Sequence, residues 1–303
     1  LMAVPMVLPV IVGALGLIAI WGRQGLLNAA LLSAGVEQPF SIYGLSGILI
    51  AHVFFNLPLA VRFFLAGLER MPGEYWRMSA VLGMNSLSTF RFIEWPVVRR
   101  LVPGVAGLIF MLCATSFTLV LLLGGGPAAT TIEVAIYQAL RFDFDPPRAI
   151  ALSLMQIAMT GLLLVLLSFL PGAEAEGQTQ GQTVRRFDAA RPLARLWDGL
   201  VIVLAMLLVG SPLVAVAASG LTADLWRLLS AEIFRRAAIT SLSIALVSAT
   251  LSVLVSVALI RARQVIADNN APVWGTRLIA ATLGGGASMV LLVPPVVLGS
   301  GWF

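Results

Sequence analysis

Glu74–Arg100 reads EYWRMSAVLGMNSLSTFRFIEWPVVRR and connects two long apolar segments of the 303-residue chain. Its apolar residues recur at helical spacing, and residues typical of helix ends separate them. A simple solvated connector has no need of such a pattern, and apolar side chains that stay in water usually contact a partner. The stretch therefore predicts a folded loop that presents an apolar face to another molecule.

The first half of this loop predicts a short helix. Pro72 suits its beginning, Glu74 lies in the first turn, where a carboxylate is stabilised by the helix dipole, and Gly83 suits the C′ position that ends it. Three apolar residues fall on one face at positions i, i+3 and i+7: Tyr75, Met78 and Leu82. Such a helix either docks on a partner or lies on lipid headgroups, and the spacing leaves both interpretations open.

The second half predicts another short helix, which starts at Ser86 after a turn. Phe90 and Ile93 are expected on one side of it. Pro96 is expected to stop or kink it, because proline lacks a backbone N–H. The pair Arg99–Arg100 then lies at the membrane edge, where long side chains can snorkel towards water.

The composition of the whole chain is that of a membrane protein. Hydrophobic residues make up 59% and charged residues 11% of the sequence, whereas a soluble domain carries about 25% charged residues. The following apolar stretches are each long enough to cross about 30 Å of hydrocarbon as a helix: 1–21, 44–68, 101–123, 148–170, 196–220, 237–260 and 276–303. We expect an all-α, polytopic transmembrane helical bundle of about seven spans.

The basic residues and the single cysteine exclude several classes of function. All 19 basic residues are arginine, so the glycine runs Gly124–Gly126 and Gly284–Gly286 cannot be lysine-bearing phosphate loops. The arginines lie mostly in short loops between the spans, a pattern typical of membrane orientation and not of nucleic-acid binding. One cysteine, Cys113, and one histidine, His52, exclude a disulfide framework and a Cys/His metal cluster. No cofactor is expected.

Arginine bias predicts the side of the membrane on which each loop lies. Eleven arginines lie in the loops on one side: 69–100, 171–195 and 261–275. Five lie in the loops on the other side: 22–43, 124–147 and 221–236. The loop 69–100 is therefore expected in the cytoplasm.

The two ends of the chain resemble each other. Pro9–Gly13 reads PVIVG and Pro295–Gly299 reads PVVLG, at an offset of 286 residues. Chance likeness between Val- and Pro-rich spans is one explanation, and a parallel duplication is the other. A polar, linker-like stretch at 171–195 falls where a module junction is expected. The chain, which begins at Leu1, is thus expected to be a fragment that holds parts of two tandem modules.

The boundaries predicted for these parts follow from the linker. Residues 1–171 are expected to be the C-terminal part of module one, with the cytoplasmic loop 69–100 inside it. Residues 172–195 form the cytoplasmic linker. Residues 196–303 are expected to be the truncated N-terminal part of module two.

The loop 69–100 resembles the signature cytoplasmic loop of ABC importer permeases, whose pattern is E-A-A-x3-G-x6-F-x2-I-x2-P. The second half of that pattern is matched in full by Gly83, Phe90, Ile93 and Pro96. The Glu-Ala-Ala positions are occupied by Arg77, Met78 and Ser79. Longer segments are similar to the fused-duplicate permease of bacterial thiamine importers: AHVFFNLPLAVR at 51–62, FRFIEWPVVRR at 90–100 and LGGGPAATTIEVAIYQALRFDFDPPRA at 123–149.

This resemblance implies a multi-pass protein of the bacterial inner membrane with type I importer architecture. It implies a coupling helix in the loop, which docks on a cytoplasmic ABC ATPase dimer, and a periplasmic substrate-binding protein as the second partner. ATP hydrolysis would then lie in the ATPase, and this chain would be no enzyme. The residues implied for the coupling loop are Glu74, Arg77, Met78, Ser79, Gly83, Phe90, Ile93 and Pro96.

Several polar residues outside the loop are candidates for other roles. His52 and Asn56 share a helix face in the second span, where they either bond between helices or line a translocation path. Arg62 is expected to snorkel near the cytoplasmic end of that span. Three acidic residues of the opposite loop are expected to be solvated or locally paired, or to contact the binding protein: Glu133, Asp143 and Asp145.

The function predicted from these observations is permeation of thiamine or its phosphates in an ATP-driven importer. A ferric-iron or other small-solute importer of the same architecture is the first alternative. An ATP-independent channel or secondary transporter is a second, but it would require intramembrane charges that the spans almost lack. An integral membrane enzyme lacks a catalytic cluster, since one intramembrane histidine cannot complete a triad.

Overall fold

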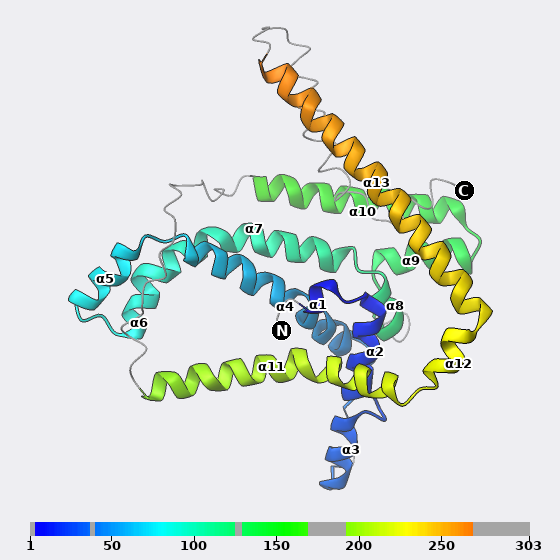
Figure 1. Ribbon diagram of the computed structural model, residues 1–303, viewed down its shortest axis with the longest axis horizontal. Coiled ribbons are helices and arrows are strands. Elements are labelled where there is room, and N and C mark those ends of the chain that lie inside the picture. Colours follow the sequence, from blue (N-terminus) through cyan, green and yellow to red (C-terminus); the bar gives the residue numbers. More distant parts are fainter. Residues whose placement is uncertain (1–3, 37–39, 125–128, 169–191, 269–303) are drawn as a thin grey trace. The chain divides into compact units, whose positions relative to one another are not determined.

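The computed structural model of the chain describes residues 4–36, 40–124, 129–168 and 192–268 (Figure 1). Every regular element within these ranges is a helix, which confirms the all-α prediction. The described residues fall in two compact units that divide between Ala217 and Ala218. The helices up to the division are α1 Val4–Val7, α2 Val10–Trp21, α3 Leu26–Ser33, α4 Leu45–Glu69, α5 Gly73–Val81, α6 Ser86–Thr89, the π-helix η1 Phe90–Glu94, α7 Trp95–Ala114, α8 Thr118–Leu123, α9 Ile132–Arg141, α10 Pro146–Ser168 and α11 Pro192–Leu221.

Five segments among the described residues are long and apolar enough to cross a membrane: Val10–Ser33, Leu45–Glu69, Ser86–Ala114, Arg195–Leu221 and Glu232–Arg261. They correspond to the first, second, third, fifth and sixth predicted spans. The 23-residue helix α10 coincides with the fourth. The seventh predicted stretch, 276–303, and the repeat at Pro295–Gly299 lie outside the described residues, as does most of the predicted linker 172–195.

Two predicted span boundaries are wrong. The first span is not one helix from residue 1, because the helix is interrupted before Pro9, and Pro9 is the N-cap of α2. The third span begins at Ser86, inside the predicted loop, and its helix ends at Ala114 instead of residue 123. The remaining apolar residues of that stretch form the separate helix α8.

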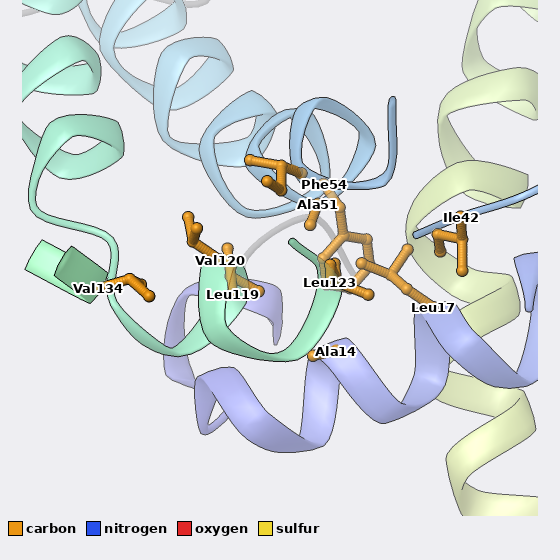
Figure 2. Close-up of a cluster of buried hydrophobic side chains, with 10 residues drawn as sticks. Ala14, Leu17, Ile42, Ala51, Phe54, Leu119, Val120, Leu123 and Val134 are labelled. Carbon is orange, nitrogen blue, oxygen red and sulfur yellow. The ribbon is translucent and has the colours of Figure 1, made fainter. Parts of the chain in front are cut away.

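Within the first unit, α4 packs along α7, and α10 packs against both α7 and the short helix α9 (Figure 1). The helix α8 packs on α2 and α4. A cluster of buried apolar side chains joins these elements, with Leu119, Val120 and Leu123 of α8 directed towards Phe54 of α4 and Leu17 of α2 (Figure 2). The cluster fixes the position of α8 although its own helix is only 6 residues long.

A close approach between α2 and α11 depends on glycine. A Cβ atom added at Gly16 would lie 2.6 Å from the carbonyl oxygen of Pro212 and 2.9 Å from a methyl group of Val216. Small residues allow membrane helices to approach in this way and to gain dispersion contacts without a hydrophobic driving force. The C-terminal half of α11, around Pro212, therefore packs with α2, which precedes the linker.

The second unit contains two helices among the described residues, α12 Leu225–Ser230 and α13 Glu232–Asp268. Asp224 caps the first, because its carboxylate accepts a hydrogen bond from the backbone N–H of Arg227. α13 has 37 residues and carries the serine-rich sixth span. Its spanning part buries none of its apolar residues against the rest of the described chain.

Candidate functional site

The helix α5 begins and ends as its sequence predicts. Pro72 is its N-cap, Glu74 lies in its first turn, and Gly83 has a φ of 62°, in the left-handed region that favours glycine. The Gly83 N–H donates to the carbonyl of Ala80, and the Met84 N–H donates to the carbonyl of Ser79. This pair of bonds is the Schellman motif, which satisfies the last carbonyl groups of a helix locally.

The apolar face predicted on α5 is exposed. Tyr75, Met78 and Leu82 each keep about half or more of their surface in solvent, and Val81 beside them keeps 87%. Glu74 and Arg77 are also exposed. Ser79, by contrast, is buried, and its hydroxyl donates to the carbonyl of Trp76. Among the expected loop residues on this helix, Ser79 is therefore internal and the others form a free surface in the described chain.

The helix that follows starts at Ser86 as predicted, and Asn85 caps it. The Asn85 side-chain oxygen accepts a hydrogen bond from the Ser88 N–H at 2.8 Å. Asparagine is among the strongest N-cap residues, so the Asn-Ser pair after Gly83 was the available signal for this cap. The cap residue was missed in the sequence, although the helix start was not.

Of the two outcomes expected at Pro96, a stop and a kink, the stop is wrong, because the helix continues through this residue to Ala114. A π-helical turn, Phe90–Glu94, comes immediately before this proline, and the Trp95 N–H donates to the Phe90 carbonyl five residues earlier. Proline removes one helical N–H and crowds the carbonyl four residues before it, and the wider π turn accommodates both effects. The second half of the loop, from Ser86 onwards, and the third span are thus one helical segment.

The π turn also changes which side chains share a face. Ile93 is 7% exposed, whereas Phe90 is 45% exposed and packs against Trp95 with ring centroids 6.1 Å apart. The expectation that Phe90 and Ile93 lie on one side is therefore wrong. Phe90 belongs to the exposed surface of the loop, and Ile93 belongs to the interior.

A second candidate site lies where α7 ends. His52 Nε2 lies 3.3 Å from the Cys113 carbonyl oxygen, and His52 Nδ1 lies 3.0 Å from the Ile48 carbonyl oxygen. A neutral imidazole has one N–H, so it donates to one of these oxygens at a time. Asn56 donates to the His52 carbonyl at 2.9 Å and approaches the Cys113 sulfur at 3.5 Å. Both predicted polar residues of the second span therefore bond between helices.

Gln156 reaches the same helix end from α10. Its Nε2 donates to the Ala114 carbonyl oxygen at 3.2 Å, and its side chain is fully buried. It lies on a buried stripe of α10 that is polar, with Ser153 and Thr160 on the same face. Gln156 was not identified as a site residue from the sequence. The only signal for it was a lone glutamine within an apolar span.

The acidic residues of the opposite loop behave differently from one another. Glu133 is 0% exposed, which contradicts the solvated or paired state expected for it, and burial raises the pKa of its carboxyl group to about 7. Asp143 pairs with Arg148 at 3.0 Å, and Asp145 accepts a hydrogen bond from the Arg148 N–H, so local pairing is confirmed for these two. No three His, Cys, Asp or Glu side chains of the described ranges come together as a metal site requires.

Curated relatives match the whole of this chain. It is 50% identical over 303 residues to the thiamine transport system permease protein ThiP of Brucella suis biovar 1 (strain 1330), of which it covers 54%. It is 44% identical over 309 aligned residues to the protein of the same name from Escherichia coli (strain K12), of which it covers 55%. The chain thus spans about half the length of these relatives.

A more distant relative is named for a different substrate. The molybdenum transport system permease protein ModB of Mycobacterium bovis (strain ATCC BAA-935 / AF2122/97) is 30% identical over 169 residues, which cover 54% of this chain and 61% of that protein. No protein-family model matches the chain. No solved structure matches it either.

Proposed function

We propose that this chain is part of the permease of an ATP-driven importer, and its similarity along its whole length to thiamine transport system permease proteins supports this proposal. The transporter moves thiamine or its phosphates from the periplasm to the cytoplasm across the bacterial inner membrane. The identity of 44–50% to proteins of that name over the full chain is the observation that carries this proposal. The chain itself hydrolyses no ATP, and a separate ATPase subunit supplies the energy.

The loop formed by α5, α6 and η1 is the proposed docking element for the ATPase dimer. Its exposed apolar residues Tyr75, Met78, Leu82 and Phe90 support this role, because such a surface is stabilised by a partner. The Schellman motif and the Asn85 cap keep both short helices folded at the moment of docking. Arg77 replaces the family's acidic residue, so the charged contacts of this loop differ from the usual set.

The continuity of the third span suggests how docking would move the membrane part. Ser86–Ala114 is one helical segment, so a displacement of the loop is carried along α7 to its end at Ala114. Because α4 and α10 bond to that end, the displacement also reaches these helices. ATP binding that draws two such loops together would rock the modules between outward- and inward-facing states.

The module organisation is also part of the proposal. Residues 1–171 are the C-terminal part of module one, 172–195 the cytoplasmic linker and 196–303 the N-terminal part of module two. The length of the relatives, about twice that of this chain, supports two modules in the whole protein. The arginine bias supports a cytoplasmic loop 69–100, which leaves α9 and its neighbours on the side of a periplasmic binding protein.

Substrate uptake into vesicles tests the proposal. The full-length permease, its ATPase and its binding protein are reconstituted with ATP on the side of the ATPase, and radiolabelled thiamine uptake is measured with and without ATP. ATP-dependent uptake of thiamine supports the proposal. Uptake of Fe³⁺ or molybdate in place of thiamine supports another importer of this architecture. Of these two alternatives, the similarity to ModB favours molybdate. Thiamine uptake that is equal without ATP indicates a channel.

A further inference from the structure

The end of α7 is a break in a membrane span whose last carbonyl groups are held by other helices. α7 ends at Ala114, and α8 begins at Thr118. Backbone at the depth of the hydrocarbon requires internal partners, and broken helices are tolerated in transporters where they line a cavity. Residues Cys113–Phe117 are partly exposed, so the break is reachable from one side.

Gln156 brings a further acceptor to this break. Its Nε2 is fixed on the Ala114 carbonyl oxygen, which places the amide group at the helix end. Its Oε1 is buried and has no hydrogen-bond partner. A flipped amide would set two oxygens against each other, so the bonding fixes Oε1 as the free atom. A buried acceptor without a partner is costly, and a bound donor would remove that cost.

Two helix ends of opposite polarity meet at the break, because α8 begins at Thr118 and its N-terminal end carries partial positive charge. The C-terminal end of a helix carries partial negative charge, and Cys113 and Ala114 are the last residues of α7. The Gln156 oxygen adds another partial negative charge beside them. The unpartnered Gln156 oxygen beside the end of α7 favours a ligand that carries an N–H donor.

We propose that the break after Ala114 is a substrate subsite, where the Gln156 Oε1 accepts a hydrogen bond from an organic cation during translocation. The proposal rests on the proposed function, because thiamine is an organic cation with an amino group on its pyrimidine ring. In the empty state the Gln156 N–H holds the end of α7, and Oε1 is the acceptor that is left for the amino group. Gln156 is then a residue that determines specificity.

A purely structural role of Gln156 would lead to different results in the variants. If Gln156 only holds α7, its N–H is the important group and its oxygen is not. Gln156→Glu separates the two roles, because it keeps acceptor oxygens and loses the donor to Ala114. Gln156→Leu loses both. Ser153→Ala is the matched control, since Ser153 is buried on the same face of α10 and its hydroxyl donates to the Ala149 carbonyl of its own helix.

The test measures uptake of thiamine and of oxythiamine, in which a carbonyl replaces the amino group, by vesicles that contain the full-length permease and its partners. We expect the wild type and Ser153→Ala to prefer thiamine by about tenfold or more, because oxythiamine places a carbonyl oxygen where the site accepts a hydrogen bond from the amino group. Gln156→Glu is expected to keep that preference, and Gln156→Leu to lose it. Thermal unfolding of each purified variant shows whether it folds.

Each other outcome overturns the inference. If Gln156→Glu and Gln156→Leu lose uptake equally while the remaining preference for thiamine is unchanged, Gln156 has a structural role only. If Gln156→Leu does not fold, the preference of Gln156→Glu decides, and its loss contradicts the subsite. If the wild type takes up no thiamine, the proposed function is wrong and the inference is wrong with it, whereas thiamine uptake with no effect at Gln156 contradicts the inference alone.

Discussion

The C-terminal ends of α5 and α7 both leave carbonyl groups without helical partners, but their bonding partners come from different distances along the chain. At α5 the donors are the N–H groups of Gly83 and Met84, within the same turn. At α7 the donors include His52, 61 residues away, and Gln156, 42 residues away. The helix end in the loop is thus satisfied locally, whereas the helix end inside the bundle has local donors at Thr115 and Ser116 and is also bonded by neighbouring helices.

The surfaces around the two ends are opposite in character as well. Around α5 apolar side chains are exposed, and around the end of α7 polar side chains are buried. In water an exposed apolar surface usually marks a site that contacts a partner. In a membrane segment a buried polar group usually marks a functional site. Each region therefore has its own reason to bind another molecule, which is exposed apolar surface at α5 and an unpartnered acceptor at the end of α7.

The largest effect is expected when the local cap of α5 is removed. Gly83→Pro cannot adopt a φ of 62°, since proline fixes φ near −65° and lacks the N–H that Ala80 accepts. We expect the loop to lose at least about 3 kcal/mol of local stability and substrate-stimulated ATP hydrolysis to fall more than tenfold. Gly83→Asn, which tolerates the left-handed region, should retain most of the coupling.

The matched control for this series is Gly104→Ala on α7, where an added Cβ has no atom within 4 Å. It should leave ATP hydrolysis unchanged. Full coupling in Gly83→Pro would mean that the fold of this loop is not required for docking.

The next effect concerns the buried carboxyl group of Glu133. Its pKa is about 7 in the folded chain against 4.5 ordinarily, so the protonated form is favoured by folding. This contribution is fully present below pH 4.5 and is lost as the pH rises through 7. Since one pKa unit corresponds to about 1.4 kcal/mol, we expect the unfolding free energy of the full-length permease to fall by about 3 kcal/mol over that range through this group.

Thermal unfolding of Glu133→Gln between pH 5 and 8.5 checks this expectation. The variant should lose most of the pH dependence that the wild type shows. Asp143→Asn is the control, because Asp143 is exposed and paired with Arg148, and it should keep the wild-type profile. An unchanged profile in Glu133→Gln would show that another group titrates.

A smaller effect is expected at the N-cap of the second loop helix. Asn85→Ala removes the acceptor for the Ser88 N–H, which typically costs about 1 kcal/mol. The expected result is a modest, partial loss of ATPase coupling with normal thermal unfolding of the membrane part. Leu87→Ala, which alters an exposed side chain beside the cap, separates cap loss from loss of docking surface.

The smallest effect is expected for the long-range partners of α7. His52→Leu removes the bond to the Cys113 carbonyl, and hydrogen bonds between membrane helices are worth on average about 0.6 kcal/mol. The unfolding midpoint of the permease should therefore fall only slightly. Asn56→Leu should cost no more, and a double variant whose loss greatly exceeds the sum would show that the two residues act as one network.

The same comparison explains what the sequence could and could not predict. Gly83, Ser86 and Glu74 were placed correctly because helix caps and dipoles act over a few residues. The break after Ala114 was not predicted, because its apolar neighbours read as one continuous span and its stabilising partners are distant in sequence. The passage through Pro96 was missed because the π turn that accommodates it has no local signature.

Spans were predicted better than their interiors. Composition and length were sufficient for α4 and α11, whose bounds agree with the prediction within a few residues. The buried state of Glu133 was not predictable, because α9 is short and its carboxyl-bearing face is decided by packing on α10 and not by hydropathy. The polar stripe of α10 is likewise a property of the bundle.

The central claim, that the exposed face of α5 docks on an ATPase, is tested most directly by the affinity of the full-length permease for that ATPase. Leu82→Asp places a charge on this face, where Leu82 is 67% exposed. Phe144→Asp, at a residue 77% exposed in the opposite loop, is the control. The account predicts that Leu82→Asp weakens binding at least tenfold while Phe144→Asp binds as the wild type does. Wild-type affinity in a normally folded Leu82→Asp would contradict it.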